Sequence, residues 1–179
     1  MRRTIFVISI LALSFFIYAK DKKSELKTAD FVDLNRSMGT WYEIARITHW
    51  FERGLIDVSA TYRLLPNGDI EMVNSGHKGS LDGKFKTAKG RARIIDKISN
   101  SKLKASFFWP FWGRYWIIDV GKEYEYAVIG NPNLKYLWIL SRTPDMREDL
   151  YQDILRRAQL QGFDTSRLEK RQMRSSEKK

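Results

Sequence analysis

The sequence predicts an all-β fold, a barrel or a sandwich, with one helix near the C-terminus. Eight short segments between residues 39 and 142 follow one another at regular spacing, and several of them alternate apolar and polar side chains, as antiparallel strands do. A helical pattern of apolar residues follows the last segment. Aromatic residues make up 13% of the 179 residues, so the chain has enough apolar surface to fold as one domain.

The strands are expected between turn signals. Pro66-Asn67-Gly68 is typical of a hairpin turn, and Asn131-Pro132-Asn133 separates the last two segments. A helical turn over residues 30–35 is expected to close one end of the sheet. The predicted strands are residues 39–48, 57–65, 69–78, 88–96, 102–109, 114–120, 124–131 and 134–142.

The single helix is expected to begin directly after the last strand. Thr143 is its predicted N-cap, Pro144 its first residue, and Gly162 its end. Residues 168–174 form a weak strand that fades into a basic tail. The apolar face of the helix, which we expect to pack on the sheet, consists of Met146, Leu150, Ile154 and Ala158.

The N-terminus is typical of a secretory signal peptide. Arg2 and Arg3 precede a nearly unbroken apolar run that ends at Ala19, which is shorter than the roughly 20 residues of a membrane span. We expect cleavage after Ala19; retention of the segment as an anchor is the alternative. The predicted organisation is residues 1–19 signal peptide, 20–29 linker, 30–164 barrel with helix, and 165–179 basic tail.

Composition and motifs argue against several functions. The net charge of +11 favours anionic partners, but no nucleic-acid recognition motif accompanies it. The absence of cysteine excludes disulfides and thiolate chemistry. His49 and His77 are the only histidines, and neither lies in a nucleophile or metal-binding motif. We therefore predict no enzyme activity, no cofactor and no metal.

Three ordered motifs identify a family resemblance. Gly39-Thr40-Trp41-Tyr42, the segment 126–130 and Ser141-Arg142-Thr143-Pro144 resemble the three motifs of the lipocalins. The resemblance covers about residues 30–164, and within the family the chain most resembles bacterial outer-membrane lipocalins and apolipoprotein D. It implies an eight-stranded antiparallel up-and-down barrel with the C-terminal helix packed on its side.

Strand alternation indicates which residues face the barrel lumen. Leu103, Ala105, Phe107 and Trp109 oppose the charged face of Lys102 and Lys104, so these four are predicted to face the lumen. For the C-terminal strands, which are apolar on both faces, the family resemblance sets the parity. The predicted ligand-binding residues of the lumen and mouth are Ala60, Met72, Ala105, Phe107, Tyr115, Ile117, Ala127, Trp138, Trp50 and Phe51.

Many of the inward positions are small, including Ala60, Ala88 and Gly90, so a packed core would lack bulk there. We expect an apolar cavity that binds an apolar molecule. The alternative is that Trp138, Phe107, Tyr115 and Met72 fill the space themselves.

Three further features have structural and functional interpretations. The resemblance implies that Arg142 stacks on Trp41 at the closed end of the barrel, which is a structural role. Glu43 is a candidate inward carboxylate near that end, either a structural acid or a catalytic one. Lys89, Arg91, Arg93, Lys102 and Lys104 form an outer basic stripe, either a solvated face or a site for anionic headgroups.

The resemblance implies reversible binding and transport or storage of a fatty acid or lysophospholipid for cell-envelope maintenance. The basic stripe leaves peripheral contact with anionic membrane open, and the aromatic residues of the mouth leave a homodimer open. Bacterial relatives usually carry a lipidated cysteine that this chain lacks, so the expected location is the periplasm or the periplasmic face of the outer membrane. The alternatives are a lipid isomerase, an envelope interaction protein with a filled barrel, and a haem or pigment carrier.

Overall fold

The computed structural model describes residues 25–47 and 53–171, and it confirms the eight predicted strands. Trp50, Phe51 and the predicted signal peptide lie outside the described residues. The strands are β1 (Gly39–Ile47), β2 (Leu55–Leu64), β3 (Ile70–Lys78), β4 (Phe85–Ile94), β5 (Lys102–Phe108), β6 (Phe111–Val120), β7 (Tyr126–Gly130) and β8 (Leu137–Ser141).

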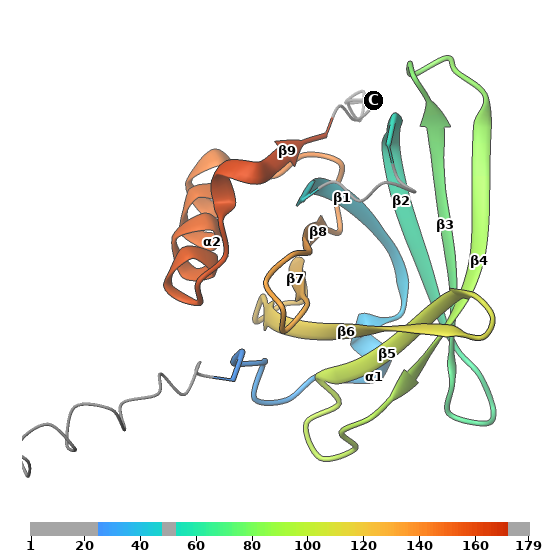
Figure 1. Cartoon of the computed structure of the whole chain (residues 1–179), viewed down its shortest axis with the longest axis vertical. Helices are drawn as coiled ribbons and strands as arrows, with labels where there is room; N and C mark the ends of the chain where they lie inside the picture. Colours follow the sequence, from blue (N-terminus) through green and yellow to red (C-terminus); the bar gives the residue numbers. More distant parts are fainter. Residues whose placement is uncertain (1–24, 48–52, 172–179) are drawn as a thin grey trace, which may run out of the picture.

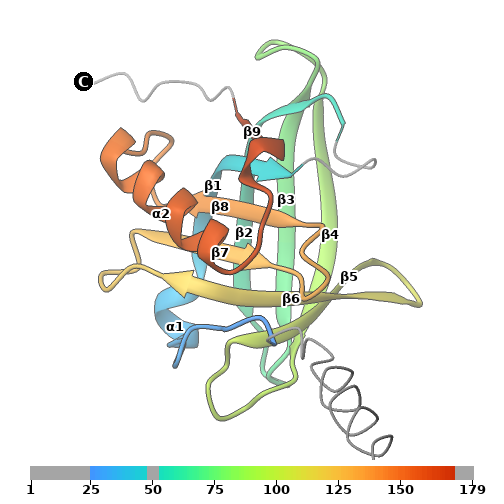
Figure 2. The ribbon, with the colours of Figure 1, turned by 60° about the vertical axis from the view of Figure 1, so that its left-hand side comes forward.

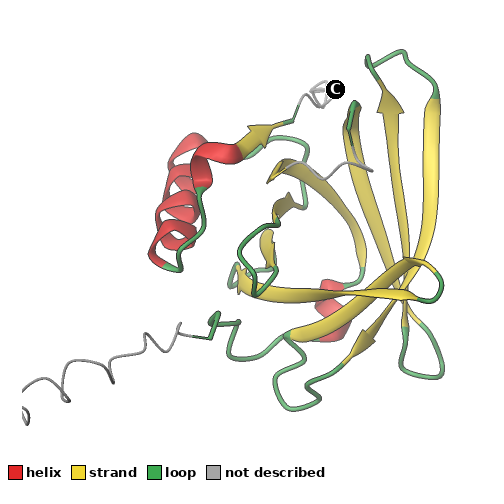
Figure 3. Ribbon diagram, in the orientation of Figure 1, coloured by secondary structure: helices red, strands yellow, loops and turns green. Residues whose placement is uncertain are grey.

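The strands form one antiparallel barrel (Figures 1 and 3). Each strand pairs with its neighbour in the chain, and β8 pairs with β1. Pairing of residues 39–42 with residues 59–62 of β2 closes the ring. Farther along, β1 pairs instead with a short ninth strand, β9 (Leu168–Lys170), which follows the one-turn helix η2 (Thr165–Arg167). The weak strand expected at 168–174 is therefore present over three residues.

A register shift in β1 changes which side chains face the lumen. The shift lies between Glu43, which is opposite Leu140, and Ala45, which is opposite Ile139. After this bulge, Arg46 is opposite Trp138 and faces the lumen, whereas Ala45 packs in the outer core with Ile44. Bulges re-aim side chains in this way because an extra residue breaks the two-residue alternation.

The C-terminal helix α2 (Glu148–Leu160) begins later than predicted. Its N-cap is Arg147, not Thr143, and Pro144 precedes the helix. The Thr143 hydroxyl donates to the Asp145 carbonyl at 2.6 Å, so it stabilises an irregular connection instead of capping the helix. Gly162, at φ 92°, follows the helix end as expected.

Helix α2 packs against the outer face of the barrel (Figure 2). Tyr151, Ile154 and Ala158 are buried there, and Leu150 and Leu155 are partly buried against the same core. The predicted apolar face is therefore confirmed from Leu150 to Ala158, whereas Met146 packs against this core from a position before the helix. Among the helices of the described residues, none has the length and apolar character needed to cross a membrane.

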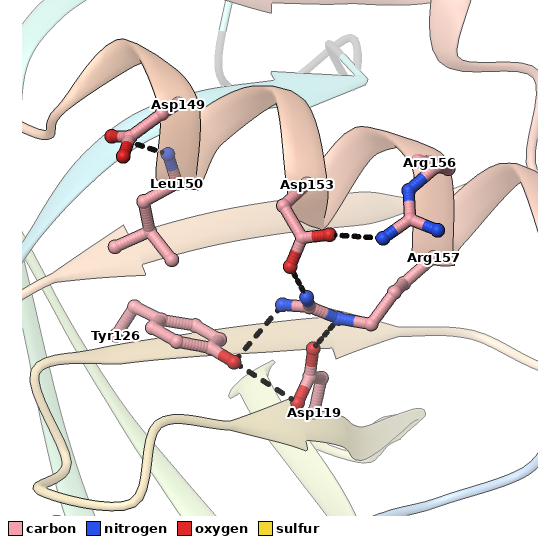
Figure 4. A network of polar contacts seen from close by, with 7 residues as sticks. All are labelled: Asp119, Tyr126, Asp149, Leu150, Asp153, Arg156 and Arg157. Carbon is pink, nitrogen blue, oxygen red and sulfur yellow. Dashed lines mark hydrogen bonds and ion pairs between the residues drawn. The ribbon is translucent and has the colours of Figure 1, made fainter.

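A polar network at the edge of this interface fixes the helix to β6 and β7 (Figure 4). The Arg157 guanidinium donates to Asp119 at 2.8 Å and to the Tyr126 hydroxyl at 3.0 Å. Asp153, one turn earlier, pairs with both Arg156 and Arg157. Burial raises the pKa of Tyr126 to about 12, and the nearby Asp119 carboxylate adds to the rise.

The short helix α1 (Leu34–Ser37) lies at one end of the barrel, slightly later in the chain than the predicted helical turn. The predicted stacking is present beside it, since the Arg142 guanidinium lies 3.7 Å from the centroid of the Trp41 ring. Arg142 also donates to the carbonyls of Thr40 and Arg36. Gly39 has φ 90°, and a Cβ there would contact Arg142 at 3.4 Å, so the motif requires glycine.

Candidate ligand cavity

The lumen contains an apolar cavity of about 370 Å³ in the half that lies away from helix α1, which is called the upper half below. This volume lies within the range of about 300 to 1,000 Å³ that small-molecule sites occupy. The cavity reaches the surface beside the β5–β6 hairpin, where Phe108 and Phe111 line it and are exposed. Its polar lining is sparse and includes Asn74, Ser106 and Tyr136.

A pair of tyrosines forms the floor of this upper cavity. The hydroxyls of Tyr62 and Tyr115, on β2 and β6, lie 2.9 Å apart across the lumen. Below them is a second cavity of only about 50 Å³ whose lining includes Val32, Trp41 and Ile70. A void of that size holds at most a few waters, and its apolar walls favour an empty space.

Eight of the predicted ligand-binding residues lie in the described part of the chain, and all of them line these cavities. Ile117 and Ala127 line the lower cavity, and Tyr115 borders both. Trp50 and Phe51 lie outside the described residues. The predicted residues of the upper cavity are Ala60, Met72, Ala105, Phe107, Tyr115 and Trp138.

Two of the small inward positions do not contribute open space. Ala88 is exposed, because β4 pairs with β5 only from Arg91 onward. At Gly90 the ring of Phe107 occupies the space, since a Cβ would come within 2.7 Å of it. Aromatic side chains therefore fill part of the lumen, and the cavity remains above the two tyrosines.

The residues that form the cavity rim were not predicted from the sequence. The fifth strand was expected to extend to Trp109, with that side chain in the lumen. Instead, β5 ends at Phe108 and its register shifts after Ala105, so Trp109 lies in the exposed turn. The run of five aromatic residues around Pro110 was the available signal.

Glu43 lines the upper cavity, not the closed end as predicted. Its carboxylate lies 2.6 Å from the Arg46 guanidinium and 3.3 Å from that of Arg171. The side chains of Glu43 and Arg46 are 5% and 0% exposed. This cluster lies just beyond the point where the pairing of β1 with β2 ends. Arg46 also donates to the Leu55 carbonyl at 3.2 Å. The ion pairs favour the structural interpretation of Glu43.

The outer wall of β4 and β5 carries the predicted basic stripe, but several of its charges have partners. Asp69 pairs with Arg91 at 3.5 Å and with Arg93 at 3.3 Å, and Lys102 pairs with Glu25 at 2.8 Å. Across the described residues, His, Asp and Glu side chains form no cluster of three that could hold a metal ion.

A β-barrel with an apolar cavity open at one end defines a class of small-molecule binding proteins. Residues 32–173 match the family model of the lipocalin-like domain. Outer membrane lipoprotein Blc of Vibrio cholerae is 41% identical over 137 residues, which cover 76% of this chain and 80% of the relative.

Apolipoprotein D of Mus musculus is 34% identical over 121 residues, covering 63% of this chain and 61% of that protein. Among solved structures, insecticyanin from Manduca sexta superimposes with a TM-score of 0.67 at 19% identity, over 83% of this chain and 85% of that one. The chain therefore belongs to the lipocalin family, and this membership supports binding of a small hydrophobic ligand.

Proposed function

We propose that the protein binds, transports or stores a lipid with a single acyl chain, a fatty acid or a lysophospholipid, in the upper cavity. The observation that carries the proposal is the 370 Å³ space with apolar walls that opens beside the exposed hairpin. The acyl chain lies between the β-sheet walls above Tyr62 and Tyr115. The headgroup stays at the rim, where Arg114, Asn131 and Tyr136 supply polar groups.

The expected affinity is modest. Burial of about 12 methylenes at about 0.8 kcal/mol each gives roughly 10 kcal/mol. Association costs of about 4 to 15 kcal/mol oppose this gain. At the lowest of these costs a surplus of about 6 kcal/mol remains, which corresponds to a dissociation constant of some tens of micromolar and suits a carrier that must also release its ligand.

The cell envelope is the proposed setting. The relative from Vibrio cholerae is named an outer membrane lipoprotein, and the basic wall of this chain favours peripheral contact with anionic membrane. Export through the predicted signal peptide, to the periplasm or the periplasmic face of the outer membrane, belongs to the same proposal. Binding requires no chemical step, and the ion pairs of Glu43 argue against its use as a free acid or base.

The first test is equilibrium dialysis of delipidated protein against palmitate and a palmitoyl lysophospholipid. We expect micromolar binding that Ala105→Trp weakens at least about tenfold, because the indole fills space that the ligand needs. Thr87→Trp is the matched control, since Thr87 is exposed on neighbouring β4 and does not line the cavity.

Absence of binding by the wild-type protein would favour the filled-barrel interaction protein. Equal binding by the wild type and the Ala105→Trp variant would place the ligand outside the cavity. Mass spectrometry of lipid extracted from native protein identifies the headgroup, and an absorption spectrum checks for haem or a pigment.

A further inference from the structure

Three aromatic side chains at the tip of the β5–β6 hairpin are not covered by the rest of the barrel. Phe108, Trp109 and Phe111 are 66%, 82% and 77% exposed, and Pro110 between them is exposed as well. Single exposed apolar residues are ordinary on protein surfaces. Adjacent exposed aromatic rings on one turn form an apolar patch, and such patches mark interaction sites.

The strand pairing explains why this tip projects from the barrel. Residues 91–94 of β4 pair with residues 103–106 of β5, and the pairing between these strands ends there. The β5–β6 pairing continues farther, to Phe108 opposite Phe111. The end of the hairpin is therefore held by its own two strands, and in Figure 2 its turn extends to the right beyond the neighbouring strand β4.

Positive charge borders the tip on the outer wall. Arg93 and Lys104 lie 5.0 and 5.1 Å from the centroid of the Trp112 ring, on opposite strands of the β4–β5 pair. Arg114 is opposite Lys104 in the β5–β6 register and is exposed. Although Asp69 pairs with Arg93, this part of the wall keeps a positive balance.

Aromatic rings at a loop tip with cations behind them match the interfacial region of a bilayer that contains anionic lipids. Trp and Phe insert beneath the headgroups, and Lys and Arg contact the phosphates. A second copy of this chain is a less suitable partner for the tip. Two copies that met through this wall would bring like charges together.

We propose that the β5–β6 tip inserts into the surface of an anionic bilayer and aligns the cavity with it. Phe108 and Phe111 belong both to the tip and to the cavity lining. An acyl chain can therefore pass between bilayer and cavity along these rings without crossing water. This transfer step rests on the proposed lipid-binding function, whereas the docking does not.

The test is co-sedimentation of the full chain with vesicles of phosphatidylcholine containing phosphatidylglycerol. We expect Trp109→Ser to weaken binding about tenfold, because it removes the most exposed ring of the tip. Trp109→Phe restores most of the binding. The matched control is Ile98→Ser, which removes a 90% exposed apolar side chain from the β4–β5 connection and leaves vesicle binding unchanged.

Two further measurements separate insertion from charge alone. Brominated acyl chains quench Trp109 in the inserted tip, so the wild type loses more emission than Trp109→Phe. Binding to vesicles of pure phosphatidylcholine is expected to be weaker, and so is binding at high salt, because attraction to anionic headgroups is then absent or screened. Arg114→Gln is expected to weaken binding because it removes a positive charge beside the tip.

Equal vesicle binding by wild type and Trp109→Ser would overturn the docking proposal. So would a dimer in sedimentation velocity that Trp109→Ser dissociates while vesicle binding persists, since the patch would then cover a second copy. Palmitate dialysis without vesicles separates the two proposals. Trp109→Ser retains palmitate binding there. If the wild type sediments with vesicles and Trp109→Ser does not, but the wild type binds neither palmitate nor the lysophospholipid, the carrier function alone is overturned.

Discussion

Glu43 and Arg46 show how one extra residue in a strand can place a charge pair inside a barrel. The bulge after Glu43 turns Arg46 toward the lumen, where its side chain is fully buried. A buried charge without a partner is costly, so Glu43 is required once Arg46 is inside.

Glu43→Gln is expected to destabilise the fold by about 3 kcal/mol, because it removes the carboxylate that balances a buried guanidinium. Urea unfolding measures this change. Glu169→Gln is the control, since Glu169 pairs with the same Arg171 but is 58% exposed, and its loss costs less than about 0.5 kcal/mol. A stable Glu43→Gln variant that binds lipid but loses turnover of a lipid substrate would instead support the enzyme alternative.

Among single residues, inward parity was predictable wherever a strand alternates regularly. Ala60, Met72 and Ala105 line the cavity because each lies on a face whose opposite side is polar. Arg46 was not predictable, since a bulge leaves no clear mark in the residue pattern. Trp109 was misassigned for the same reason, because the shift in β5 ends the alternation before the turn.

At the scale of elements, α2 is joined to the barrel by an apolar face and by the Arg157 network. Tyr126 belongs to both, since its ring is buried in the core under the helix and its hydroxyl accepts from Arg157. Its ionisation would place a second negative charge beside Asp119.

This environment predicts a loss of stability at high pH. The folded-state pKa of Tyr126 is raised to about 12, above the value of about 10 expected in the unfolded chain. Below pH 10 the stabilisation is fully present. As pH rises from about 10 to about 12, the unfolded chain releases this proton and the folded chain keeps it, so stability falls.

We expect this group to account for a loss of about 1 to 2 kcal/mol, after allowance for screening by the adjacent charges. The measurement is urea unfolding of wild type and Tyr126→Phe at about pH 9 and about pH 11.5. Because other tyrosines and lysines titrate in both proteins, their effects cancel. A stability difference that does not change with pH would contradict the assignment.

The elements themselves were largely predictable, and their ends were less so. Turn residues such as Gly68 fixed the hairpin between β2 and β3. The start of α2 was misplaced because Thr143 and Pro144 are typical N-terminal helix residues. In the structure, local hydrogen bonds to Ser141 and Asp145 hold that segment outside the helix.

At the scale of the whole molecule, Arg142 joins the start and the end of the barrel. It follows β8, stacks on Trp41 in β1 and donates to the Arg36 carbonyl in α1. Family resemblance predicted this contact. Alternation alone could not have done so, because the two residues are 101 positions apart.

Arg142→Met is expected to destabilise the protein by about 2 to 3 kcal/mol, through loss of the stacking and of the hydrogen bonds to two carbonyls. Thermal unfolding in the absence of lipid measures this directly. Arg147→Met is the control, because Arg147 is 79% exposed and pairs with Asp149 at the surface. Equal melting temperatures for the two variants would show that the closed end does not depend on Arg142.

The hydroxyl pair of Tyr62 and Tyr115 has a consequence for selectivity. The hydrocarbon tail of the proposed ligand would reach only as far as these two hydroxyl groups. Every carbon beyond that depth would remain near the entrance of the cavity. Short and long tails would then differ in how much of them stays outside the pocket. Selectivity for tail length would therefore depend on the entrance, where the apolar rings of Phe108 and Phe111 form the surface against which the extra carbons would lie.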